Sequence, residues 1–158
     1  TWLRLADVYL MYAEAAAQGY GSPAGKDGSF SKNAIEALNT VRQRAGIGDL
    51  ADKYATSLDG FMNELRRERA VELAFEGHRF NDLRRWLLLA EYPYNIKTKQ
   101  EFDRAKVLDP KVDPKENAVL NFREEVIVER NLSSKHYWFP FKTQDVSIYP
   151  EFGQNPGW

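Results

Sequence analysis

The 158-residue chain contains no cysteine, which excludes disulfides, zinc–thiolate sites and thiol nucleophiles. It has no excess of either charge, because 22 lysines and arginines offset 23 aspartates and glutamates to give a net charge of -1. Proteins that bind nucleic acid normally carry a basic patch or stripe, so the composition disfavours nucleic acid as a main partner. The sequence also lacks a run of about twenty apolar residues, and it therefore predicts no membrane-spanning helix.

Four stretches of the sequence have helical periodicity or capping signals, and they predict a mostly α-helical fold. Asn33 or Ser31 can cap the second stretch, where Glu36 completes a capping-box spacing after Asn33 and Gly46 supplies a stop. Asp59 is expected to cap the third. Small residues on the first two stretches favour an antiparallel pair of the tetratricopeptide type, although no 34-residue repeat is visible. The expected helices cover residues 2–18, 32–45, 60–76 and 81–92.

The first expected helix is apolar on nearly every side, which is typical of a helix buried between neighbours. Its exceptions, Arg4, Asp7 and Glu14, share one stripe and are expected to pair with each other or with an arginine across an interface. No cap or turn precedes the helical pattern of residues 2–8. We therefore expect that Thr1 is not the natural start and that an N-terminal portion is missing.

The second half of the sequence has weaker patterns. Residues 93–118 are polar and charged and include Pro110 and Pro114, so they predict a long loop. Residues 125–129 and 137–141 are expected to form a small β-hairpin through a turn at 131–135. From Pro140 to Trp158 the chain is aromatic, without helical periodicity, and is expected to be extended.

The densest group of charges lies in residues 68–86, which indicate two helical segments hinged at Gly77. Three glutamates recur every four residues and would form one column on a helix. Arginine neighbours lower carboxylate pKa values, whereas acid catalysis needs a raised one, so the pattern favours structural ion pairs over a reactive site. The residues assigned to this network are Glu68, Arg69, Glu72, Glu76, Arg79 and Asp82.

No catalytic, metal-binding or cofactor-binding constellation is expected. The two histidines, His78 and His136, are too far apart in the sequence to form a pair four residues apart on one helix, as a helical two-histidine zinc site would need. Asp109, Asp113 and Glu116 could supply oxygen ligands to calcium, but they do not follow a calcium-loop spacing.

Aromatic residues are the more suggestive candidates for ligand binding. Loop tyrosines give sugar rings a flat apolar surface and keep a hydroxyl for hydrogen bonding. Most other aromatics are expected in the core, among them Trp2, Phe61, Phe75, Phe80 and Trp86. The tyrosines predicted to lie on or near loops, and hence to contact a ligand, are Tyr20, Tyr54, Tyr92 and Tyr94.

Four blocks of the sequence, in this order, resemble the SusD/RagB family. The first runs from Arg4 through Leu-Ala-Asp-Val-Tyr-Leu-Met-Tyr-Ala-Glu-Ala, and the second from Ala37 through Leu-Asn-Thr-Val-Arg-Gln-Arg-Ala-Gly. The third is the charged block at 68–86, and the last joins Phe139-Pro-Phe to the closing Gln-Asn-Pro-Gly-Trp158. The resemblance implies that residues 1–158 are the C-terminal part of a SusD/RagB-like domain, with tetratricopeptide-like helix pairs and a loop-rich ligand face.

The resemblance also implies a function. Proteins of this family bind glycans or other oligomeric nutrients without catalysis at the bacterial cell surface. They are lipid-anchored in the outer membrane through an N-terminal segment absent from this chain, and they serve a SusC-like TonB-dependent transporter. The matching motif residues are structural, so the resemblance assigns no sugar-contacting residue here.

Two other functions stay open from the residues alone. The predicted helix pair is compatible with a helical-repeat scaffold that binds only proteins. The acidic residues, Glu72 and Glu76 above all, are compatible with a glycoside hydrolase, in which two carboxylates flank the scissile bond.

Overall fold

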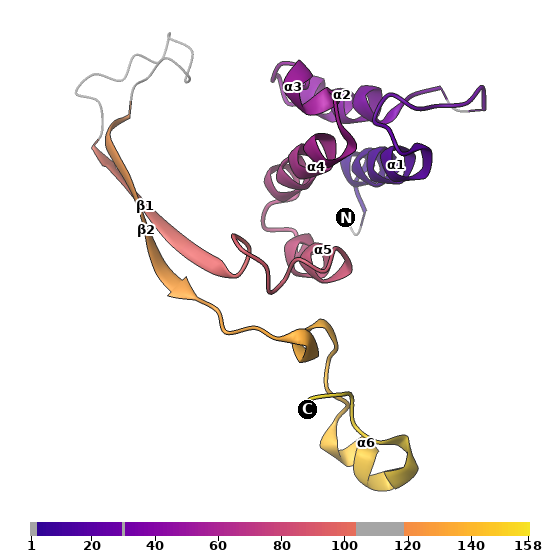
Figure 1. Ribbon diagram of the computed structural model, residues 1–158, viewed down its shortest axis with the longest axis vertical. Coiled ribbons are helices and arrows are strands. Elements are labelled where there is room, and N and C mark those ends of the chain that lie inside the picture. The colour runs from indigo at the N-terminus through magenta and orange to yellow at the C-terminus, as the bar shows by residue number, and fades with distance from the viewer. Residues whose placement is uncertain (1–2, 30, 104–118) are drawn as a thin grey trace. The chain divides into compact units, whose positions relative to one another are not determined.

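The computed structural model describes residues 3–29, 31–103 and 119–158 (Figure 1). The chain divides into two compact units, Thr1–Arg79 and Phe80–Trp158. The described residues are mostly helical with one small antiparallel sheet, which confirms the predicted fold class. Among them, no helix is both long and apolar enough to cross a bilayer.

The first unit is built on the helix pair α1 (Leu5–Tyr20) and α2 (Ala34–Arg44). The pair is antiparallel, because Ala6 and Tyr9 near the start of α1 line the same surface hollow as Val41 and Arg44 near the end of α2. Alanines let the two backbones approach closely. The predicted helical hairpin is thus present.

The boundaries of α2 follow the sequence signals. Asn33, not Ser31, is the cap: its side-chain oxygen accepts the Glu36 N–H at 2.8 Å, and the Glu36 carboxylate accepts the Asn33 N–H at 2.7 Å. At the other end Gly46 has φ +74°, and the Ile47 N–H donates to the Arg42 carbonyl at 3.1 Å. This is the Schellman arrangement, which satisfies carbonyls left open at a helix end.

The core of the first unit lies where α4 (Leu58–Glu72) packs against α1, with α2 on α1 as well (Figure 1). The short helix α3 (Asp52–Ala55) packs on α4. Each long helix contributes apolar residues at helical spacing, so one continuous cluster forms. Its largest fully buried side chains are Phe61, Leu10, Leu38, Leu65 and Val41.

The structure corrects both ends of the third predicted helix. Ser57 caps α4, with its hydroxyl accepting the Gly60 N–H at 3.1 Å, so Asp59 lies inside the helix. The helix ends at Glu72, because the backbone then leaves the helical region and Phe75 and Gly77 both take positive φ. Glu76 therefore does not continue the helical column. The turn at Gly77 leads into α5 (His78–Arg85), which is shorter than the predicted 81–92.

Several aromatic predictions were wrong in this chain. Phe61 is fully buried as expected, but Phe75 is fully exposed and Phe80 is 46% exposed. Trp86 is only partly buried, and Trp2 lies outside the described residues. The first helix was expected to be buried all round, yet it exposes Leu5, Val8 and Met11.

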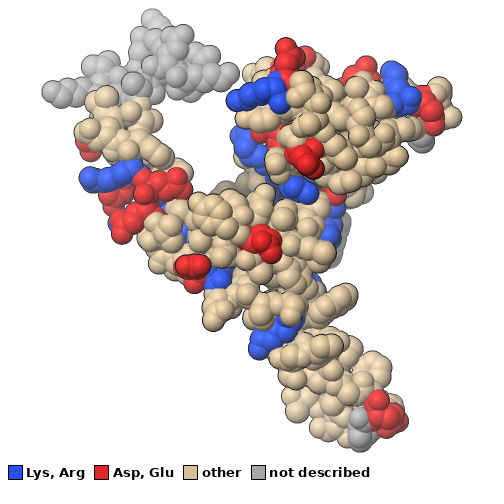
Figure 2. Space-filling view, in the orientation of Figure 1, with Lys and Arg blue, Asp and Glu red and all other residues tan. Residues whose placement is uncertain are grey.

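The second unit contains an antiparallel hairpin of β1 (Ile96–Asp103) and β2 (Leu120–Glu129). The prediction of a strand at 125–129 is right, but its partner is β1 from the expected loop, not residues 137–141. Cross-strand charge pairs support the mostly polar β1: Lys99 lies 2.8 Å from Glu125, and Arg123 lies 2.7 Å from Glu101. Figure 2 shows acidic and basic side chains side by side along this hairpin.

The C-terminal segment has more structure than the expected extended chain. It contains the 3₁₀ turns η1 (Ser134–Tyr137) and η2 (Pro150–Phe152) with α6 (Thr143–Ile148) between them. The Gln154 side-chain amide bonds both backbone polar groups of Phe141, at 2.8 and 3.0 Å. The Trp158 indole N–H donates to the carbonyls of Lys135 and Trp138. These bonds explain the conspicuous Gln-Asn-Pro-Gly-Trp ending: its polar side chains hold residues 135–141.

Candidate functional site

The charged block of the sequence forms ion pairs within the first unit, with partners drawn from α1 and α2. Arg42 lies 2.6 Å from Glu68 and 3.7 Å from Glu64. Arg4 and Arg44 approach the same Glu72 oxygen at 2.9 and 2.6 Å. These carboxylates are thus fixed by arginines of neighbouring helices, an arrangement that stabilises helix packing.

Arg69, Glu76 and Arg79, three further members of the predicted network, each have a different kind of partner. Arg69 lies 2.6 Å from Asp7, and both side chains are only 4% exposed, so α1 and α4 share a buried pair. This is the cross-interface pairing expected for Asp7. Glu76, beyond the end of α4, lies 2.7 Å from Arg4. Arg79 donates to the Arg66 carbonyl at 3.4 Å.

Asp82, the last member of the predicted network, is buried on α5 and lies 2.9 Å from Arg85 on the next helical turn. The spacing of residues 68–86 suggested that their acids pair with bases of the same block across the Gly77 turn, and the structure corrects this interpretation. Arg42 and Arg44, two main partners, come from α2, which the spacing within the block could not indicate.

Glu64 gives the charge network a dependence on pH. A hydrogen-bonded pair with Arg67, at 2.5 Å, lowers the pKa of this carboxyl below its usual 4.5, with further help from the charge of Arg42. A lowered pKa in the folded state stabilises the fold above the unfolded-state pKa, and this contribution is lost as the pH falls through the folded value.

We therefore expect wild-type protein to lose more stability than Glu64→Gln when the pH falls from 7 to well below 4.5. The variant has no carboxylate to protonate at this position, so its curve should be flatter. Urea denaturation at a series of pH values measures the difference. Parallel curves for the two proteins would contradict the assignment.

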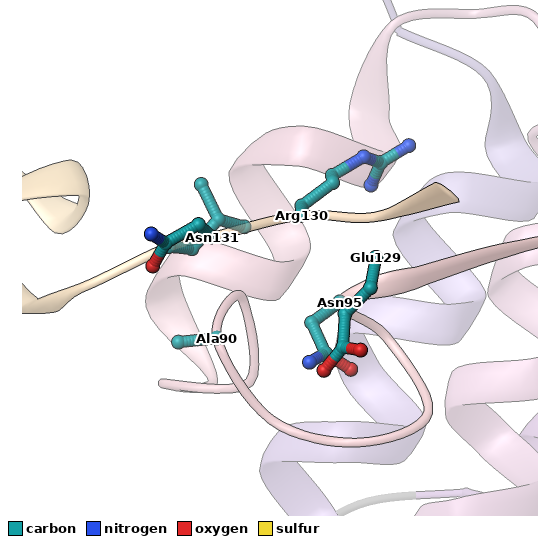
Figure 3. Close-up of a pocket in the computed structure, with 6 residues that line it drawn as sticks. Ala90, Asn95, Glu129, Arg130 and Asn131 are labelled. Carbon is teal, nitrogen blue, oxygen red and sulfur yellow. The ribbon is translucent and has the colours of Figure 1, made fainter.

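The second unit contains a polar pocket of about 390 Å³ (Figure 3). It forms where the turn between α5 and β1 passes the end of β2, and the Arg130 N–H ties the two segments by donating to the Asn95 carbonyl at 2.8 Å. The chain brings these segments together because β1 and β2 are antiparallel, so the start of one meets the end of the other. The pocket is lined by Ala90, Asn95, Glu129, Arg130, Asn131 and Leu132.

Most of the side chains that line the pocket carry hydrogen-bonding groups. Figure 3 shows the Glu129 and Asn95 side chains close together, with the Arg130 side chain pointing away from them. Asn95 Oδ1 is shielded from solvent and has no hydrogen-bond partner among the described residues. Buried acceptors without a partner are uncommon, because each carries an uncompensated desolvation cost. A ligand that donates hydrogen bonds would relieve this cost.

Two of the predicted ligand tyrosines lie on the turn that leads into the pocket. Tyr92 and Tyr94 flank Pro93, and Asn95 follows directly. The Tyr94 N–H donates to the Glu91 carbonyl at 2.8 Å, so the turn is fixed by its own backbone. Tyr92 is 77% exposed, whereas Tyr94 is partly buried. Tyr92 therefore offers an open ring face three residues before Asn95, although it is not itself one of the residues that line the pocket.

The other two predicted tyrosines belong to the first unit. Tyr54, on α3, is partly buried against the core cluster. Tyr20, at the end of α1, donates its hydroxyl to Asp27 at 2.9 Å, and this bond raises the pKa of the tyrosine. Tyr20 and Tyr12 line an apolar hollow of about 340 Å³ on α1. The four predicted tyrosines thus belong to two different units, two to each.

Sequence reasoning missed the polar lining of the pocket. Asn95 could have been found, because it directly follows the tyrosine turn. Glu129, Arg130 and Asn131 carried no such signal, since they meet the turn only through the pairing of β2 with β1, which was expected to be a loop.

No group of three side chains able to hold a metal ion occurs in the described parts of the chain. The calcium candidates Asp109, Asp113 and Glu116 lie outside the described residues.

Known proteins give an independent view of the chain. The model of the SusD family matches residues 1–158. The SusD-like protein P25 of Formosa agariphila is 41% identical over 90 residues, which cover 56% of this chain and 15% of that protein. A SusD-like protein crystal structure from Bacteroides fragilis matches 99% of this chain and 25% of its own, with a TM-score of 0.70 and 25% identity.

The chain therefore spans a quarter or less of the length of these two relatives. The family match covers every residue, and the fold of the B. fragilis protein agrees with the helix pair and small sheet described above. The chain belongs to the SusD family.

Proposed function

We propose that the chain is the C-terminal part of a larger SusD/RagB-like protein that binds glycans, or other oligomeric nutrients, without catalysis. Membership of the SusD family supports this role. The observation that carries it here is the polar pocket of the second unit, together with the exposed Tyr92 three residues before the lining residue Asn95. A flat ring beside amide and carboxylate groups suits a sugar, which has apolar faces and a rim of hydroxyls.

The proposal includes the cellular setting. The whole protein would be held at the surface of the outer membrane by a lipid anchor in its N-terminal part. There it would deliver its ligand to a SusC-like TonB-dependent transporter. Co-purification with such a transporter from solubilised outer membranes tests this partnership, and recovery of the protein in the absence of any transporter would count against it.

Replacing Tyr92 with alanine should weaken binding of the preferred glycan by about two- to twelvefold, because an aromatic contact contributes roughly 0.5–1.5 kcal/mol beyond its buried area. Isothermal titration of the full-length protein against a glycan panel identifies that ligand and then measures the loss.

Tyr149→Ala is the matched control for the Tyr92 substitution. Tyr149 is 61% exposed in the same unit, but it does not stand on the turn that leads to Asn95, so its removal should leave the affinity unchanged. An equal loss in both variants would show that the effect is not local to the pocket. Absence of binding to every glycan and peptide oligomer would overturn the proposed function.

The alternatives have less support from the contacts. A protein-binding scaffold would draw on the α1–α2 pair, which is present, but it gives no role to the polar pocket. For a hydrolase, the Glu72 oxygen Oε1 is already shared by Arg4 and Arg44. A carboxylate held in this way serves packing well and proton donation poorly.

A further inference from the structure

The charge of the pocket bears on which sugars it can take. Two acceptor groups lie together on its wall: the Glu129 carboxylate and the Asn95 side-chain oxygen (Figure 3). An ionised carboxylate accepts hydrogen bonds and donates none. The partner that completes such a surface must bring donors.

Neither acceptor has a side-chain partner within the part of the chain that the structure describes. Asn95 Oδ1 has no hydrogen-bond partner although it is shielded from solvent. Glu129 forms no ion pair within the described chain, in contrast to Glu125 on the same strand, which lies 2.8 Å from Lys99. The hairpin therefore pairs Glu101 and Glu125 with basic side chains, whereas Glu129 at the pocket is left to interact with a ligand.

Adjacent hydroxyls on an uncharged sugar ring match this surface, because each hydroxyl donates one hydrogen bond and a carboxylate can accept two at once. A uronic acid or a sulfated sugar places its own negative charge against Glu129. Like charges at short range oppose binding, and an acceptor-only substituent cannot satisfy Asn95 Oδ1.

We propose that the pocket selects uncharged over acidic glycans, an inference that rests on the proposed function. Glu129 is the specificity-determining residue, and Asn95 is its hydrogen-bonding neighbour. Ala90 and Leu132 are the apolar members of the lining, and Arg130 and Asn131 are its other polar members.

The test compares three uncharged hexasaccharides, made of glucose, galactose or mannose, with their counterparts oxidised to uronic acids at C6. Each is titrated into the full-length protein at low and at high salt. Wild-type protein should bind at least one uncharged hexamer about tenfold or more tightly than its uronate counterpart. High salt should narrow this ratio, because it screens the repulsion.

Glu129→Gln keeps the size of the side chain and removes its charge. The substitution should lower the affinity for the uncharged hexamer by about tenfold, because charge-assisted hydrogen bonds are lost. It should raise the affinity for the uronate hexamer, because the repulsion is removed. Glu124→Gln is the matched control: it makes the same change on the same strand outside the pocket lining, and it should leave the ratio as in wild type.

The outcomes separate this inference from the function on which it rests. Tighter binding of a uronate than of its uncharged counterpart, or an unchanged ratio in Glu129→Gln, would overturn the selection and leave glycan binding intact. Failure to bind any of the six hexamers would overturn both glycan binding through this pocket and the selection.

Discussion

Replacing Arg69 with alanine should lower the free energy of unfolding by about 3–5 kcal/mol, the cost of removing one partner of a buried ion pair. The guanidinium lies 2.6 Å from Asp7, and each side chain is only 4% exposed. After the substitution the Asp7 carboxylate would stay buried between α1 and α4 without its counter-charge. Urea denaturation at neutral pH measures the change.

Arg44→Ala provides the contrast for this prediction. Arg44 also forms an ion pair at 2.6 Å, with Glu72, but its side chain is 59% exposed. Because water can replace most of the interactions of this exposed side chain, the free energy of unfolding should fall by no more than about 1 kcal/mol. Equal losses for Arg69→Ala and Arg44→Ala would mean that burial does not govern these pairs.

The double variant Asp7→Leu with Arg69→Met separates pairing from packing. Replacing both members of a buried pair by apolar residues is often neutral or stabilising, because no charge is left unpaired. We expect it to recover most of the stability lost in Arg69→Ala. A loss as large as that of the single variant would indicate that the volume at this contact, rather than the charge, is limiting.

Replacing Phe61 with alanine should also cost about 3–5 kcal/mol, because the ring is fully buried in the α1–α2–α4 core and its removal leaves a cavity. The loss combines the transfer of apolar surface to water with the contacts that the surrounding side chains can no longer make. Thermal and chemical denaturation should both report it.

Phe75→Ala is the control for Phe61→Ala, because it makes the same substitution at a solvent-exposed position. Phe75 is fully exposed in the turn after α4, so truncation to alanine should change stability by no more than about 0.5 kcal/mol. From sequence alone both phenylalanines were expected in the core. A large loss on changing Phe75 would mean that its ring is covered in the intact protein.

The parts of the fold that could be predicted are those whose signals are local. The capping box at Asn33 and the stop at Gly46 lie within a few residues of the ends that they determine, and both were read correctly. The predicted C-terminal end of the third helix was wrong, because the four-residue spacing of glutamates continues to Glu76 although the helix ends at Glu72. Side-chain periodicity does not record such a turn.

The hairpin and the pocket could not be predicted because they depend on partners distant in sequence. The strand β1 is mostly polar, and its stabilising contacts, such as that of Lys99 with Glu125, cross to a segment more than twenty residues later. A polar segment without a visible partner is indistinguishable from a loop. Consequently Glu129 could not be placed beside Asn95, although Tyr92 was recognised as a ligand candidate.

The buried pair of Asp7 and Arg69 also sets the register of one helix on another. Along α4 the apolar residues Phe61 and Leu65 and the acids Glu64 and Glu68 each repeat after four residues. A slide of α4 by one turn would therefore keep much of its apolar and ionic pattern. A slide by four residues would put Leu65 or Leu73 in the place of Arg69 and would bury the Asp7 carboxylate against leucine. A single salt bridge thus makes one alignment of α1 and α4 preferable to its nearest competitors.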